Sequence, residues 1–212
     1  MNTDNLITAL AADLETRPTP VWRALVNALV LSTPIAVGLL IYVLDVRPDI
    51  RSAFSTVRFD FKLAFMLGLA ASAVLLVSRL SRPGASARSA LLTVAAAIAV
   101  LLAAVVLEMT IVPRTDWMPT LVGTMSIPCV VLIPFLAATP LAAILFALKS
   151  GAPDNTAATG GAAGLLAGAI GAACYAPHCP NDSPLFVAVW YLIAIAAVAL
   201  VGSLIGSRLL RW

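Results

Sequence analysis

Residues 89–107, SALLTVAAAIAVLLAAVVL, contain no Asp, Glu, Lys or Arg over 19 positions. A helix that crosses a membrane needs about 20 mostly apolar residues, so this stretch is long enough to span a bilayer. Five more stretches lack these four residue types: 24–44, 63–78, 117–148, 155–181 and 183–207. Transmembrane β-strands would instead alternate apolar and polar residues over about ten positions. The sequence therefore predicts an all-α fold, a six-span transmembrane helical bundle.

The lengths of these stretches indicate where spans end. The stretch 63–78 is the shortest, and we expect Lys62 and Arg79 to extend their charged groups to water from its two ends. The stretches 117–148 and 155–181 are longer than one span, so each should include part of a loop. Only 11% of the 212 residues are charged, against about 25% in soluble proteins, which excludes an ordinary soluble domain.

The distribution of basic residues predicts the orientation. With six spans, both termini lie on one side, which carries eight of the 13 Lys and Arg residues, while the other side carries five. Cytoplasmic loops of membrane proteins carry an excess of Lys and Arg, so we expect both termini in the cytoplasm. The chain has a net charge of +3 but no basic run, so nucleic acid is not an expected partner.

Residues 1–20 precede the transmembrane domain, which we place at 21–212. Their apolar side chains recur at helical spacing and predict one face of a short helix: Leu6, Ile7, Leu10 and Leu14. Such a short helix is marginal by itself in water. Two alternatives stay open: the helix lies on the membrane surface, or its apolar face binds in a groove of a partner protein.

Glycines recur four residues apart in the last two spans. Gly160, Gly164 and Gly168 lie in the fifth stretch, and Gly202 and Gly206 lie in the sixth. Small residues at this spacing let helix backbones approach closely in lipid, so we interpret them as packing positions. A phosphate-binding loop would need a preceding strand and usually a following Lys, and neither is present.

The charged residues do not indicate catalysis or transport of a charged solute. Transporters of such solutes usually keep ionisable residues in mid-membrane, whereas here charges lie at the ends of the spans. A single His and scattered carboxylates form no pattern of nucleophile, base and orienting group. The protein is therefore not expected to be an enzyme.

The cysteines are the remaining chemical feature. Cys129, Cys179 and His178 are all predicted to lie near the outer face, His178 and Cys179 between Pro177 and Pro180. Thiols with an imidazole can bind a soft metal ion, and two thiols can form a reversible disulfide. Cys174 lies in a helix rich in Ala and Gly, and we interpret it as a small apolar residue.

Several motifs resemble the DUF1109 family, the NrsF-like membrane anti-sigma factors of proteobacteria. The resemblance covers nearly the whole chain, and its most specific motif is HCPNDSPLF, 178–186. The weaker motifs follow in the expected order: TDNLITALAADL (3–14), PVWRAL (20–25), RPDIR (47–51), SRPG (81–84), IPC (127–129) and RLLRW (208–212).

This resemblance implies a multi-pass protein of the bacterial inner membrane that holds an ECF-type sigma factor inactive at its cytoplasmic face. It also implies that an outer-face pair, which maps onto Cys129 and Cys179, senses heavy-metal or oxidant stress. We expect His178 to join this sensor, residues Leu6, Ile7, Leu10 and Leu14 to bind the sigma factor, and membrane lipid to surround the bundle. No resident cofactor is expected; a transient heavy-metal ion at Cys129 and Cys179 is the one candidate.

Two other classes of protein fit the same sequence. A small carrier or channel for a neutral solute would use the glycine-rich helices to line a continuous polar path. A purely structural membrane subunit would respond to no change at its cysteines. Anti-sigma factor is the leading hypothesis, and the signal, metal or oxidant, is left open by the residues.

Overall fold

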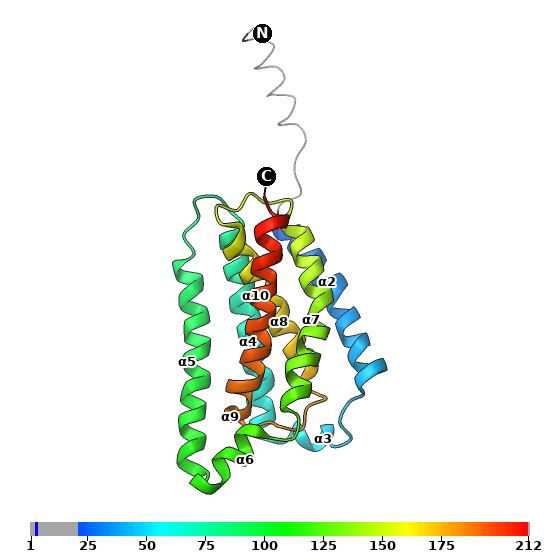
Figure 1. The fold of residues 1–212 in the computed structure, drawn as a ribbon, viewed down its shortest axis with the longest axis vertical. Helices are drawn as coiled ribbons and strands as arrows, with labels where there is room; N and C mark the ends of the chain where they lie inside the picture. Colours follow the sequence, from blue (N-terminus) through cyan, green and yellow to red (C-terminus); the bar gives the residue numbers. More distant parts are fainter. Residues whose placement is uncertain (1–2, 4–20, 212) are drawn as a thin grey trace.

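The computed structural model describes residue 3 and residues 21–211 as a bundle of helices (Figure 1). Within this part of the chain, six helical segments are long and apolar enough to cross a membrane: Val21–Leu44, Val57–Leu80, Arg88–Ile111, Arg114–Leu148, Thr156–Tyr175 and Pro184–Leu209. The prediction of an all-α, six-span bundle is confirmed. The predicted orientation of the termini and the division at residues 20 and 21 stay predictions.

Several spans consist of more than one element. Val21–Leu39 (α2) continues as a π-helical turn, Leu40–Leu44, and a short α3, Ile50–Ala53, follows. The second and third spans are single helices, α4 (Val57–Leu80) and α5 (Arg88–Ile111). The fourth span consists of a 3₁₀ turn (Arg114–Asp116), α6 (Trp117–Val122) and α7 (Ser126–Leu148). The fifth span is the single helix α8 (Thr156–Tyr175). The sixth span consists of α9 (Pro184–Phe186), a π-helical turn (Val187–Tyr191) and α10 (Leu192–Leu209).

The long charge-free stretches include loops, as expected. The fourth breaks between α6 and α7, where Gly123 has a φ of 56°. The fifth stops being helical after Tyr175, so residues 176–181 form a loop. Asn155 caps the start of α8, since its side chain accepts a hydrogen bond from the Ala158 N–H at 2.9 Å.

Helix α8 lies at the centre of the bundle and packs against α10, α7 and α4. Glycine permits the closest of these approaches. A Cβ atom at Gly202 of α10 would lie 2.5 Å from the Gly160 carbonyl oxygen, and one at Gly171 would lie 2.8 Å from the Ile133 carbonyl oxygen of α7. The glycines of α8 and α10 therefore act in helix packing, as their spacing predicts.

The outer helices are less enclosed. Figure 1 shows α5 at one edge of the bundle and α2 at the opposite edge, where it packs on α7. Of the 24 residues of α5, only Ala90, Leu101 and Glu108 are buried. The exposed apolar side chains of α5 suit a helix that faces lipid on most of its circumference.

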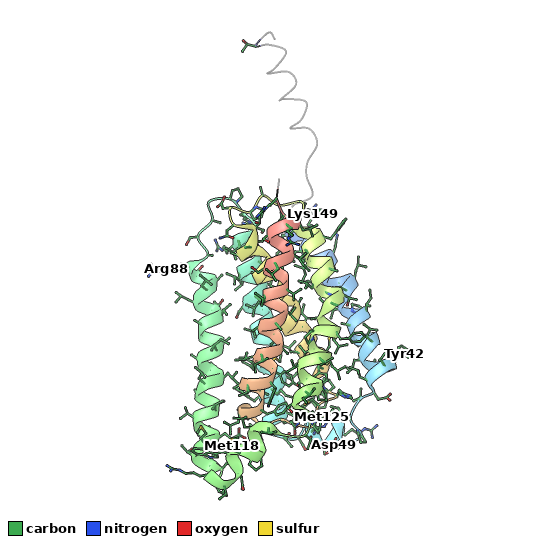
Figure 2. The ribbon with its side chains drawn as sticks, viewed as in Figure 1. Tyr42, Asp49, Arg88, Met118, Met125 and Lys149 are labelled. Atoms are coloured by element: carbon green, nitrogen blue, oxygen red, sulfur yellow. The ribbon has the colours of Figure 1, made fainter. Side chains whose placement is uncertain are left out.

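Loops with different roles lie at the two ends of the bundle. The start of α2, the end of α10 and the connections 81–87 and 149–155 share one end, where Arg88 and Lys149 are labelled in Figure 2. Asp49 and Met125 lie at the other end (Figure 2). That second end also holds the loop after α8, and with it the candidate site.

Candidate functional site

Two cysteines from distant parts of the chain meet at this end of the bundle. The Sγ atoms of Cys129 and Cys179 lie 3.8 Å apart, although 50 residues separate them in sequence. Cys129 lies in the first turn of α7 and Cys179 in the loop after α8, and both side chains are fully buried. The structure therefore brings together the two thiols that the resemblance implies as a pair.

Proline and helix-end hydrogen bonds shape the loop that carries Cys179. The N–H groups of His178 and Cys179 donate to the Tyr175 carbonyl oxygen at 2.9 and 3.3 Å, which closes the last turn of α8. Ser183 then caps α9, because its hydroxyl accepts from the Leu185 N–H at 3.1 Å. With Pro184 in the first turn of α9, the loop is held at both ends.

Lys62 of α4 lies beneath this loop and is fully buried. Its Nζ donates to the Cys179 carbonyl oxygen at 3.0 Å and forms an ion pair with the Asp182 carboxylate. We expected the Lys62 ammonium to extend from the end of the span to water, and that interpretation is wrong: a carboxylate 120 residues away satisfies the ammonium inside the protein. A buried charge needs such a partner, since its desolvation is otherwise too costly.

A second cation reaches the same loop from the end of α2. Nη1 of Arg47 donates to the Cys179 carbonyl oxygen at 3.2 Å and to Asp182 at 2.8 Å. The remaining guanidinium nitrogens, Nε and Nη2, form a bidentate pair with Asp49 at 2.9 and 3.0 Å. The Arg47 guanidinium lowers the pKa of the exposed Asp49 carboxyl through these hydrogen bonds. Asp182 is thus shared between two cations, one from the connection after the first span and one from the second span.

Aromatic rings surround the thiols. Tyr175, Tyr191 and Phe186 are fully buried in the same apolar cluster as Cys129 and Cys179. The ring centroids of Tyr175 and Tyr191 lie 6.0 Å apart, and the Lys62 ammonium lies 5.8 Å from the Tyr191 ring. The pair is therefore enclosed by apolar surface, with the Lys62 ammonium nearby.

This environment favours the thiolate form of Cys179. The hydrogen bond with the Cys129 thiol and the positive charge of Lys62 lower the pKa of Cys179, against the opposing effect of burial. The thiolate is the form that reacts with oxidants and binds metal ions. Of the two thiols, Cys179 is therefore the one whose surroundings favour the thiolate.

The structure does not bring His178 to the thiols. Its Nδ1 lies 2.9 Å from the Asp45 carbonyl oxygen and therefore carries the proton, and its ring packs on Tyr175 with 5.4 Å between centroids. Cys174 is buried in α8 and free, like the other two cysteines. Among the described residues, no group of three or more His, Cys, Asp or Glu side chains is placed to hold a metal ion. Residues Leu6, Ile7, Leu10 and Leu14, predicted to bind a sigma factor, lie outside the residues that the structure describes.

Comparison with known proteins identifies the family. Residues 10–212 match the family described as NrsF, negative regulator of sigma F. The chain belongs to the NrsF family. It is 36% identical to the anti-sigma-F factor NrsF of Caulobacter vibrioides over 218 residues and 34% identical to the probable anti-sigma-F factor NrsF of Azospira oryzae over 216 residues. In both cases the match covers 100% of each chain. No solved structure matches the chain.

For this NrsF-family chain, sequence reasoning missed three charged residues beside the thiols. Arg47 and Asp182 lie within the motifs RPDIR and HCPNDSPLF, but their pairing depends on the fold. Lys62 could have been suspected because it directly precedes the shortest apolar stretch. A lysine at such a position either reaches water or finds a buried partner.

Proposed function

We propose that this protein is a membrane-bound anti-sigma factor that holds an ECF-type sigma factor at the cytoplasmic face of the bacterial inner membrane. A change at the Cys129–Cys179 pair on the periplasmic side releases the sigma factor. The observation that carries the sensing part is the 3.8 Å contact between the two sulfurs at the end of the bundle away from the start of α2. The binding part rests on the family and on the printed names of the two relatives.

Oxidation is one change open to this pair. A disulfide has an S–S bond of about 2.05 Å, so the sulfurs must approach from their 3.8 Å separation. The two thiols give up two electrons and two protons to a two-electron oxidant such as hydrogen peroxide, which is reduced to two waters. Because Cys179 lies in a loop, the shift falls on that loop and on the start of α7.

Heavy-metal binding is the second change, and the same distance favours it. Two thiolates on a tetrahedral ion with metal–sulfur bonds of about 2.3 Å lie about 3.8 Å apart. The pair has this separation in the structure. A transient soft ion would be held by Cys129 and Cys179, and His178, which is bonded to Asp45, is not needed for this arrangement.

The N-terminal segment is the proposed binding surface for the sigma factor. Residues Leu6, Ile7, Leu10 and Leu14 would bury their apolar face against the partner. Burying one such side chain contributes about 1.5–3 kcal/mol, and about 1.4 kcal/mol corresponds to a factor of ten in affinity. Leu10→Asp should therefore weaken sigma binding more than tenfold. Full repression by that variant would mean that the helix only lies on the membrane.

The packing of the bundle favours this function over a carrier of neutral solutes. Two contiguous clusters of buried, mostly apolar side chains fill its interior along α4, α7, α8 and α10. A carrier would need a polar path along these helices, where Leu, Ile, Ala and Met side chains pack against one another instead.

The test combines purification with transcription. The tagged full-length protein is isolated from membranes of its own cell, and a co-purified sigma factor is identified by mass spectrometry. Sigma-dependent transcription is then measured with and without peroxide, and separately with cadmium, in Cys129→Ser, Cys179→Ser and Cys174→Ser strains.

We expect the first two variants to lose induction while retaining the sigma factor, and the third to respond as the parent does. Loss of the response to only one agent would assign the signal as oxidant or metal. Normal induction in both Cys129→Ser and Cys179→Ser would exclude the thiol pair as the sensor. Purification without any sigma factor would exclude the binding role.

A further inference from the structure

The loop that carries Cys179 is bonded to the far end of α2. Besides the two side-chain hydrogen bonds of Arg47, the Arg47 N–H donates to the Pro177 carbonyl oxygen at 3.1 Å. The His178 Nδ1–H donates to the Asp45 carbonyl oxygen at 2.9 Å. Residues 45–47 are therefore joined to residues 177–182 by backbone and side-chain bonds together. We call this set of contacts the α2 clamp.

Arg47 is the centre of the α2 clamp. Its side chain is only 9% exposed, and its Nε, Nη1 and Nη2 are all engaged by oxygen acceptors. The planar guanidinium can donate hydrogen bonds to Asp49 from one edge and to the Cys179 loop from the other, which a lysine ammonium cannot do. A displacement of the Cys179 carbonyl would consequently act on Arg47 directly.

The backbone at the clamp is strained. Asp45 ends the π-helical turn after α2 with φ 61° and ψ 156°, a conformation that residues with a Cβ rarely adopt. Such a conformation persists only where surrounding contacts impose it, and the hydrogen bond from His178 is one of these contacts. The segment that follows α2 and its π-helical turn is thus held in place by the loop that carries Cys179.

Helix α2 also packs on the helix that carries Cys129. It packs along α7, whose first turn carries Cys129, and Ala36 of α2 belongs to the same buried cluster as both cysteines. At its other end α2 leads in sequence directly into residues 1–20. Lys62 also holds the Cys179 loop, but α4 leads from it only to the connection 81–87.

We propose that Arg47 is the positioning residue through which a change at the Cys129–Cys179 pair reaches α2, and through α2 the segment 1–20. This inference rests on the proposed function, since it names the route by which that sensor acts. A helix of 19 residues extends about 28 Å at 1.5 Å per residue, so it can carry a displacement across most of a bilayer. The thiols themselves react without Arg47; only the consequence for the sigma factor depends on it.

The experiment measures how strongly oxidation of the thiols changes sigma binding. It uses the full-length protein in membrane vesicles and the sigma factor that co-purifies with the parent. The affinity of the vesicles for the sigma factor is determined after they are kept reduced and after they are treated with hydrogen peroxide. Free thiols are counted in parallel, so that oxidation of the pair and release of the sigma factor are separate readouts. The variants are Arg47→Ala, Arg47→Lys and Arg51→Ala, the last removing an exposed arginine of α3 as the matched control.

In the parent we expect oxidation to lower sigma affinity by about tenfold, a typical coupling between two sites. Arg51→Ala should retain that ratio. In Arg47→Ala the two thiols should be oxidised to the same extent as in the parent. The sigma affinities of its reduced and oxidised forms should differ by less than about twofold. Arg47→Lys keeps the positive charge but loses the planar guanidinium with its several donors, so its ratio of affinities should lie between those of the parent and Arg47→Ala. If Arg47→Ala does not reach the membrane, Arg47→Lys tests the role of Arg47 in its place.

The two levels of the proposal fail differently. A ratio of one in the parent would refute thiol-controlled release, and the role of Arg47 with it. If oxidation lowers sigma affinity in the parent and by the same factor in Arg47→Ala, the role of Arg47 alone is refuted. If only Arg47→Lys reaches the membrane, the same result in that variant refutes it. Loss of thiol oxidation in Arg47→Ala would also overturn it, because Arg47 would then act on the chemistry of the pair and not on transmission.

Discussion

Replacement of Gly202 by alanine tests the central packing of the bundle. A methyl group at this position would lie 2.5 Å from the Gly160 carbonyl oxygen and 2.9 Å from the Gly164 Cα, whereas real contacts of this kind are essentially never below 3.0 Å. Both neighbours are backbone atoms of α8, so no side chain can rotate away. The two helices must separate for the methyl group to fit.

The expected cost follows from two opposing effects. Overpacking a well-packed interior typically costs about 1–3 kcal/mol. Alanine in place of glycine in a helix returns up to about 1 kcal/mol through its higher helix propensity. The net expectation for Gly202→Ala is therefore a loss of about 1–2 kcal/mol in the free energy of unfolding.

Gly38→Ala is the matched control. Gly38 lies in α2, and a Cβ atom there would meet nothing within 4 Å. Only the propensity effect remains, so this variant should be as stable as the parent or up to about 1 kcal/mol more stable. Reversible unfolding in mixed detergent micelles, followed by circular dichroism, gives both free energies. Equal stability of the two variants would refute the close contact between α8 and α10.

Three further predictions concern the candidate site and the orientation. The rate at which iodoacetamide modifies Cys179 should rise with pH through its lowered pKa and level off above it, because the thiolate is the reactive form. In Lys62→Met the midpoint of this pH profile, read by peptide mass spectrometry, should move upward; an unmoved midpoint would show that the ammonium does not stabilise the thiolate. Asp45→Gly should raise the free energy of unfolding by about 1 kcal/mol, since glycine adopts the backbone conformation of Asp45 without strain, and a less stable variant would contradict that account. In a cysteine-free background, a membrane-impermeant maleimide added to intact spheroplasts should label Ser55→Cys and not Ser86→Cys, both positions being exposed at opposite ends of the bundle; the reverse pattern would invert the orientation.

The sequence predicted the bundle well because span length is dictated by the bilayer. Each charge-free stretch overlaps one of the six helical spans, and the glycines spaced by four residues lie where α8 and α10 approach most closely. These features depend on local composition and need no knowledge of which helices are neighbours.

The polar surroundings of the thiols could not be predicted in this way. The partners of Lys62 and Arg47 lie 120 and 135 residues away along the chain, so their ion pairs with Asp182 exist only once the bundle is assembled. His178 was expected beside the thiols because it precedes Cys179, but neighbouring residues in a turn point in different directions, and its ring is turned toward Asp45. The pairing of Cys129 with Cys179 was likewise implied by family resemblance and not by spacing.

The complete burial of both sulfurs determines which molecules the protein can meet and how quickly. Neither Cys129 nor Cys179 has any exposed surface, and the loop above them is held by Arg47 and Lys62. A reagent reaches the sulfurs only during brief openings of this loop, so at high concentration the rate of reaction is limited by the opening rate and no longer rises with dose. We expect peroxide and bare ions to enter during such an opening more readily than bulky thiols and disulfides, because they need less space. Burial of both sulfurs should therefore slow thiol exchange between this protein and its surroundings, and exposures shorter than the opening time should leave it unchanged.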